Sequence, residues 1–171
     1  GPVRQGGGIW TQPALDPELG LLYANISNPS PNYDGSSRKG ANLFGNCLVA
    51  LRAATGERVW HYQLVRHDVW DRDLPQAPVL LDVRRSGRTI DAVAQATKSG
   101  HVFVFDRDRG EPLLEIEERS VPRSDLKGEE VQPTQPLPRH PPAFARQVFS
   151  ETEVTDISPA AHAAVLARLR Q

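Results

Sequence analysis

The chain has 171 residues, 39% of them hydrophobic and 24% charged, which is enough to bury the core of one domain. Its formal net charge is −1, so the sequence has no overall positive field that would attract nucleic acid or an anionic membrane. No apolar run approaches the roughly 18 residues of a membrane-spanning helix, and Gly1–Arg4 lack the apolar core of a signal peptide. Cys47 is the only cysteine, which excludes an intrachain disulfide and favours a small buried side chain.

Short apolar segments separated by glycine turns recur along residues 1–120. Residues 9–11 and 21–24 flank a turn in which Pro17 presets the backbone and Gly20 takes the left-handed position. The same pattern predicts further strands at residues 47–51, 58–62, 78–83, 92–96, 101–105 and 113–117, with turns at Gly56, Gly87 and Gly110. Successive hairpins without a long helical period predict an all-β fold with antiparallel sheets, either a sandwich or a propeller.

The sequence changes character after the last of these hairpins. Residues 121–157 are polar and rich in proline, and we expect an extended loop without a core of its own. Residues 158–171 predict one C-terminal helix, because Ser158 can cap its first turn and Pro159 suits its first position. The predicted divisions are therefore residues 1–120, 121–157 and 158–171.

The stretch from His67 to Asp73 combines three carboxylates, an imidazole and an indole in seven residues that follow a predicted strand. Such a group suits a site better than a core, although an exposed turn would also accommodate it. The sequence contains no G-x-S-x-G, P-loop, H-E-x-x-H or Cys/His metal motif. Gly6–Gly8 precede a strand, so they do not form the dinucleotide-binding fingerprint that opens a helix.

Three ordered segments together resemble one known family. Residues 50–60 resemble the tryptophan-docking motif of eight-bladed quinoprotein dehydrogenases, and His67–Asp71 match their H-D-x-W-D motif. Residues 8–28 resemble the strand, turn and strand that lead to their Gly-Asn-Pro loop, although Ser27 stands in place of the glycine and Arg52 replaces the docking motif's aspartate. The resemblance covers roughly residues 6–140 and is strongest to the membrane-linked glucose and polyol dehydrogenase branch. It predicts a partial β-propeller of about three four-stranded blades.

The resemblance implies the cofactor pyrroloquinoline quinone (PQQ), a bound Ca²⁺ ion, and oxidation of an alcohol or aldose in the periplasm. By the same resemblance Asp71 would be the catalytic base, and Trp10 would form the floor under the planar quinone. Asn28 would give its side-chain carbonyl to Ca²⁺, and Lys98 would hydrogen-bond the quinone oxygens. The electron acceptor would be a quinone or a cytochrome, and any membrane association would come from segments outside this chain.

Several alternatives stay open at this point. Asp68 and Asp73 are interpreted as structural, one capping a turn and the other pairing with Arg72, and His67 as a hydrogen-bonding group that supports the base. Trp60 is assigned to packing between blades. The chain could also be a non-catalytic propeller scaffold or binding module, or a small β domain that completes a propeller with other chains. If it is a dehydrogenase segment, we expect it to be inactive on its own.

Overall fold

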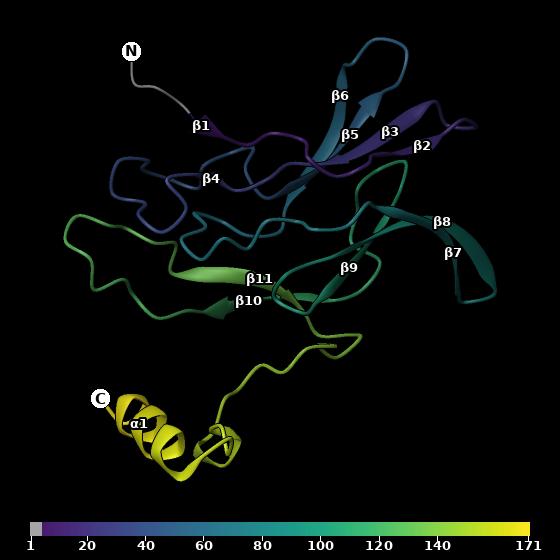
Figure 1. The fold of residues 1–171 in the computed structure, drawn as a ribbon. Helices are drawn as coiled ribbons and strands as arrows, with labels where there is room; N and C mark the ends of the chain where they lie inside the picture. Colours follow the sequence, from purple (N-terminus) through teal and green to yellow (C-terminus); the bar gives the residue numbers. More distant parts are fainter. Residues whose placement is uncertain (1–4) are drawn as a thin grey trace.

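The computed structural model describes residues 5–171. Gly1–Arg4, which we expected to lack a signal-peptide core, lie outside the described residues. The fold is all-β, with antiparallel sheets and one α-helix near the C-terminus (Figure 1). The elements are β1 (Gln5–Gly6), β2 (Ala14–Asp16), β3 (Leu21–Asn25), β4 (Pro29–Ser30), β5 (Cys47–Arg52), β6 (Arg58–Gln63), β7 (Val79–Arg85), β8 (Arg88–Ala96), β9 (Val102–Asp106), β10 (Ile116–Ser120), β11 (Thr134–Pro138), the 3-10 helix η1 (Glu151–Glu153) and α1 (Pro159–Leu169).

The first sheet has the strand order β2-β3-β5-β6. Its first turn forms as the sequence predicts, because the Asp16 carboxylate accepts the backbone N–H groups of Glu18 at 2.9 Å and Leu19 at 3.0 Å. Strand β3 then runs beside β5 with Tyr23 opposite Ala50. Strand β5 continues into the hairpin with β6, where Ala50 lies opposite Trp60.

The second sheet has three strands, in the order β7-β8-β9, and Phe105 of β9 makes one isolated antiparallel bridge to Pro112. The remaining described strands pair in twos, β1 with β4 and β10 with β11. We expected about three four-stranded blades, whereas the described residues form one four-stranded sheet, one three-stranded sheet and two two-stranded sheets. Beyond the bridge at Pro112 the Leu113 N–H still donates to the Val104 carbonyl of β9 at 2.9 Å, and β10 then begins at Ile116.

The main core lies between the first and second sheets. Trp60 of β6 packs against Tyr23, with ring centroids 5.8 Å apart, and against Phe105 of β9 at 6.1 Å. Its indole N–H donates to the carbonyl of Arg107 at 3.0 Å, and a Cβ on Gly110 would lie only 2.5 Å from the ring. Gly110, at φ +71°, thus lets the turn of the second sheet lie directly on the indole. The prediction that Trp60 packs between blades is confirmed.

Cys47 is fully buried at the start of β5, as the sequence predicts. Burial raises the pKa of its thiol to about 12, although the nearby Arg58 guanidinium opposes that shift. The thiol is therefore protonated at neutral pH, and Cys47 acts as a small apolar core residue.

The proline-rich segment differs from the expected loop. Residues Thr134–Pro138 form β11, which pairs with β10 so that Glu118 lies opposite Pro136 and Ile116 opposite Pro138. Proline is tolerated there because an edge strand need not donate an N–H at every position. The structure also places the short helix η1 in this segment.

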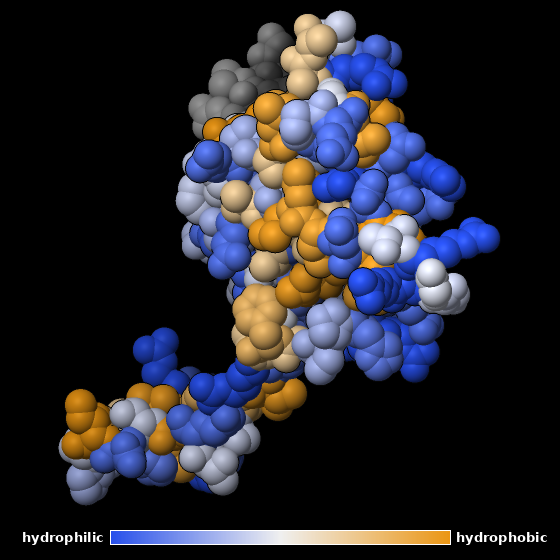
Figure 2. Space-filling view, turned by 90° about the vertical axis from the view of Figure 1, so that its right-hand side faces the viewer, coloured by the Kyte–Doolittle hydropathy of each residue, from blue (hydrophilic) through white to orange (hydrophobic). Residues whose placement is uncertain are grey.

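The C-terminal helix begins where the sequence predicts, because the Ser158 hydroxyl accepts the N–H of Ala161 at 3.2 Å. The helical segment lies apart from the sheets (Figure 1), and in the view of Figure 2 it forms a separate lobe beside a body whose surface carries a band of apolar side chains. Within residues 5–171, no helix combines the length and the apolar character that crossing a bilayer would require.

Candidate active site

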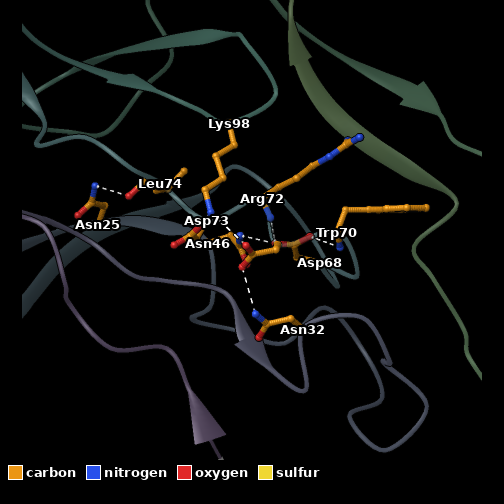
Figure 3. Close-up of polar contacts among 10 residues, drawn as sticks. Asn25, Asn32, Asn46, Asp68, Trp70, Arg72, Asp73, Leu74 and Lys98 are labelled. Atoms are coloured by element: carbon orange, nitrogen blue, oxygen red, sulfur yellow. Dashed lines mark hydrogen bonds and ion pairs between the residues drawn. The ribbon is translucent and has the colours of Figure 1, made fainter. Parts of the chain in front are cut away.

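Asp71 lies in the loop between β6 and β7, where the sequence places the candidate base. Its carboxylate accepts a hydrogen bond from the Asn32 amide at 3.2 Å and one from the Lys98 ammonium at 3.3 Å. Figure 3 labels both donors. The Asp71 side chain is 34% exposed, so its carboxylate is ordered by two donors and still accessible from solvent. Three segments that are distant in the sequence therefore meet at this group.

Lys98 is the cation of the site and stands in the turn between β8 and β9. The turn is closed by the Gly100 N–H, which donates to the Thr97 carbonyl at 3.0 Å, and by the Thr97 hydroxyl, which donates to the His101 carbonyl at 3.0 Å. The ammonium binds both Asp71 and Asp73. Burial lowers the pKa of Lys98, but the hydrogen bonds to Asp73 and Asp71 outweigh that effect, and the net pKa is raised above its ordinary value. Lys98 is therefore a permanent positive charge at neutral pH.

The structure corrects the expected partner of Asp73. We expected one of the two structural carboxylates, Asp68 or Asp73, to pair with Arg72, but Asp73 instead forms the closer of the two ion pairs of Lys98. The Asp73 side chain is only 9% exposed, whereas that of Asp71 is 34% exposed. Asp73 thus anchors the ammonium from the buried side, and Asp71 holds it at the accessible side.

Asp68 caps the loop, as the sequence suggested for one of the two structural carboxylates. Its carboxylate accepts the N–H of Trp70 at 2.8 Å and that of Arg72 at 2.6 Å. His67 is buried, and its Nδ1 lies 2.7 Å from the carbonyl oxygen of Gly40. That contact agrees with the interpretation of His67 as a hydrogen-bonding supporting group.

Trp10 and Asn28, the other two predicted site residues, lie on segments that lead into and out of β2 and β3. Trp10 is 56% exposed, whereas Asn28 is 8% exposed and its side-chain NH₂ has no partner among the described residues. Within residues 5–171, no hydrogen bond or ion pair joins either of them to Asp71 or Lys98. The same residues contain no group of three or more His, Cys, Asp or Glu side chains that could hold a metal ion.

The backbone before Asn28 does not need the glycine that the resemblance places there. The Ser27 N–H donates to Gly8 at 2.9 Å, and its carbonyl accepts from the Asn46 N–H at 3.2 Å. Ser27 is not among the residues with positive φ, so an ordinary L residue fits this position.

Two site residues were missed by the sequence reasoning. Asn32 lies in a proline-rich loop where an asparagine reads as an ordinary turn residue, yet it contacts the candidate base. Asn25 is 1% exposed at the end of β3, accepts from the Thr11 hydroxyl, and donates to the carbonyls of Leu74 at 3.2 Å and Gln76 at 2.5 Å. It ties the Trp10 segment to the end of the Asp71 loop. The sequence signal that could have identified Asn25 is a polar residue at the end of an otherwise apolar strand.

Comparison with known proteins gives the family of the chain. The family model described as "PQQ: Glucose/ethanol/alcohol dehydrogenase, beta-propeller domain" matches residues 2–171. Quinoprotein glucose dehydrogenase of Escherichia coli (strain K12) is 37% identical over 129 residues, which are 75% of this chain and 16% of that protein. Quinohemoprotein alcohol dehydrogenase of Pseudomonas putida is 40% identical over 140 residues, which are 79% of this chain and 19% of that protein.

The solved structure of quinohemoprotein alcohol dehydrogenase from Comamonas testosteroni is similar with a TM-score of 0.61 at 31% identity, over 78% of this chain and 20% of that chain. The chain thus spans about a fifth or less of the length of these three relatives. Because the family model covers residues 2–171 and the relatives match both in sequence and in fold, the chain belongs to the family of PQQ-dependent dehydrogenase β-propellers.

Proposed function

We propose that the chain supplies part of the active site of a PQQ-dependent dehydrogenase that oxidises an alcohol or a sugar hydroxyl, with Asp71 as the catalytic base. The observation that carries the proposal is the pairing of an accessible carboxylate with a permanent cation, since Lys98 lies 3.3 Å from Asp71. Alcohol oxidation requires removal of the hydroxyl proton and stabilisation of negative charge on the oxidant. Asp71 and Lys98 match these two requirements.

The two residues have separate tasks in this proposal. Asp71 accepts the substrate hydroxyl proton on its accessible carboxylate, whose orientation Asn32 and Lys98 hold. Lys98 donates hydrogen bonds to the oxygens of the cofactor, and its raised pKa keeps the ammonium charged throughout. Asp73 holds the Lys98 ammonium in place from the buried side of the site. PQQ, when bound, supplies the electrophile that accepts the hydride.

The residues present suit PQQ in chemistry. The Trp10 indole is 56% exposed and offers a flat aromatic face for stacking against a planar conjugated ring. The Lys98 ammonium offers donors to quinone oxygens. Trp10 and Lys98 would therefore be the residues of this chain that hold the cofactor.

For Ca²⁺ the donor atoms fit, but the described set is too small. The Asn28 carboxamide is buried, and its NH₂ group has no hydrogen-bond partner among the described residues. No described contact of the NH₂ therefore fixes the direction of the side-chain oxygen. Asn28 and Asp71 offer oxygen atoms, which Ca²⁺ prefers, but the ion takes about six to eight of them. We propose that Asn28 is one ligand and that the rest of the shell comes from the cofactor and from residues outside this chain.

The relatives support the substrate class of this proposal. Those named above are glucose and alcohol dehydrogenases, which favours a small alcohol or sugar as the substrate. A quinone or cytochrome as electron acceptor and a periplasmic location belong to the same proposal.

Saturating PQQ with Ca²⁺ should raise the melting temperature of the full-length protein, because a ligand bound only by the native state stabilises that state. Lys98→Gln should weaken PQQ binding about 10- to 100-fold, since it removes a charge-assisted hydrogen bond. Lys127→Gln, at an exposed position, is the matched control and should leave binding unchanged. Melting curves at graded PQQ concentrations measure both effects, and no shift in the unmodified protein would contradict the proposal.

The 171 residues purified by themselves should show no dye-linked oxidation of glucose or ethanol with added PQQ and Ca²⁺. The reason is the incomplete Ca²⁺ shell, since no metal-binding cluster exists within residues 5–171. Steady turnover by the isolated chain would show that the site is complete without further segments.

A further inference from the structure

The backbone of the Asp71 loop adopts a conformation that its residues do not favour. Asp71 has φ +55° and His67 has φ +48°, both in the left-handed region that side-chain-bearing residues rarely occupy. Such conformations persist only where the surroundings hold them, and they concentrate at functional sites. The direction of the Asp71 side chain therefore depends on whatever fixes this loop.

Asp68 is placed to fix the backbone of the Asp71 loop. Its Oδ1 accepts the N–H of Trp70 at 2.8 Å and its Oδ2 accepts the N–H of Arg72 at 2.6 Å, so the carboxylate binds the residues on both sides of Asp71 (Figure 3). Asp68 is 2% exposed. Since both oxygens are buried and occupied, Asp68 cannot itself take a proton from a substrate.

Asp68 is in turn oriented by Asn46, which stands just before β5. The Asn46 amide donates to Asp68 Oδ2 at 3.0 Å, and Asn46 is 1% exposed. The Asn46 backbone is fixed at both ends, because its N–H donates to Ser27 at 3.2 Å and its carbonyl accepts from Leu64 at 2.9 Å. This network joins the base loop to the residue that precedes Asn28.

We infer that Asp68 is a positioning residue for the oxidation, which acts by holding Asp71 at its left-handed backbone conformation, with Asn46 as the group that orients Asp68. The inference rests on the proposed function, since it assigns the loop geometry a role in proton removal by Asp71. Without Asp68, the two N–H groups beside Asp71 lose their common acceptor and the base carboxylate moves away from the substrate hydroxyl.

The test is the reduction of bound PQQ by substrate, followed by stopped-flow absorbance in the full-length enzyme loaded with PQQ and Ca²⁺. D-glucose and ethanol serve as substrates. Asp68→Asn keeps the size of the side chain but places an NH₂ group among N–H donors. It should lower the rate constant per loaded site about 10- to 100-fold, as expected when a catalytic group is displaced by about 1 Å. The absorbance amplitude should stay near that of the unmodified enzyme.

The matched control is Asp106→Asn. Asp106 also caps a turn, in the second sheet, where its Oδ1 accepts the N–H groups of Asp108 and Arg109 at 3.0 Å each. The Asp106→Asn variant should leave the rate constant unchanged. If Asp68 were only structural, Asp68→Asn would reduce the amplitude, which counts loaded sites, and would leave the rate constant as it was. That result would overturn the inference.

Two further variants separate the possible failures. The double variant Asp68→Asn with Asp71→Asn should be no slower than Asp71→Asn alone, because Asp68 acts through Asp71, whereas multiplied losses would overturn the inference. Asn46→Ala keeps the Asp68 carboxylate and serves as the test if Asp68→Asn does not fold. It should lower the rate constant less than Asp68→Asn does, and an unchanged rate constant would contradict a role for Asn46 in orienting Asp68. An unchanged rate constant in Asp71→Asn would contradict the proposed function itself. A lowered rate constant in Asp71→Asn together with an unchanged one in Asp68→Asn would contradict only the inference about Asp68.

Discussion

Replacing Asp71 by asparagine in the full-length protein is expected to lower kcat by about 10²- to 10⁴-fold, the range over which a positioned general base contributes to a rate. The amide keeps the size of the carboxylate, but its one oxygen replaces only one of the two oxygens that accept from Asn32 (at Oδ1) and Lys98 (at Oδ2). It cannot take up the hydroxyl proton at neutral pH. Bound PQQ should stay near one equivalent, because Lys98 retains its ion pair with Asp73.

The measurement is dye-linked oxidation of glucose or ethanol, with PQQ content determined from the absorbance of the same sample. Asp82→Asn provides the control, because Asp82 is an exposed carboxylate on β7, and its variant should keep full activity. Undiminished oxidation by the PQQ-loaded Asp71→Asn protein would remove Asp71 from the role of base. The non-catalytic scaffold would then be the better interpretation of the chain.

Trp60→Ala is expected to lower the free energy of unfolding by about 3 to 5 kcal/mol, the usual cost of truncating a buried aromatic side chain. Trp60 is 8% exposed, contacts aromatic rings from both sheets, and donates a hydrogen bond to the Arg107 carbonyl. Its removal would leave a cavity between the sheets, and the Arg107 carbonyl would keep only the hydrogen bond from the Tyr23 hydroxyl at 2.8 Å. Gly110, which lies against the indole ring, would face that cavity.

Urea denaturation followed by far-ultraviolet circular dichroism measures this loss. Trp70→Ala is the matched control, since Trp70 is 70% exposed and its variant should change the free energy of unfolding by no more than about 0.5 kcal/mol. Trp60→Phe should fall between the two, because it keeps part of the packing and loses the N–H donor. Equal stabilities for Trp60→Ala and Trp70→Ala would show that the contact between the sheets adds nothing to stability.

Local features were predictable because local chemistry decides them. Asp16 and Gly20 close their turn as expected, and Ser158 with Pro159 begins the C-terminal helix where a capping hydroxyl and a proline suit the first turn. The strand β11 was missed because its prolines indicate a loop. Pairing with β10 at an edge decided otherwise, and that pairing depends on a partner fourteen or more residues away.

The candidate site also contains some residues that could be predicted from local sequence and others that could not. Asp71 and Lys98 were predicted from their motifs, and their contact confirms that they belong to one place in the fold. The contact of Asp73 with Lys98 was not predicted, because Arg72 is adjacent in sequence while Lys98 lies on the turn of another sheet. Asn32 and Asn25 were missed for the same reason, since their partners lie 39 and 49 residues away.

Short segments were sufficient to predict the all-β class, the turns, the helix, the family resemblance and the candidate base, because hydrophobic period, turn residues and ordered motifs are local properties. The folded chain was needed to show which charges pair, which amides are buried against the base loop, and that Asp68 binds the residues on both sides of Asp71. These contacts join segments that the packing of two sheets and their loops brings together, and long-range packing leaves little trace in local sequence.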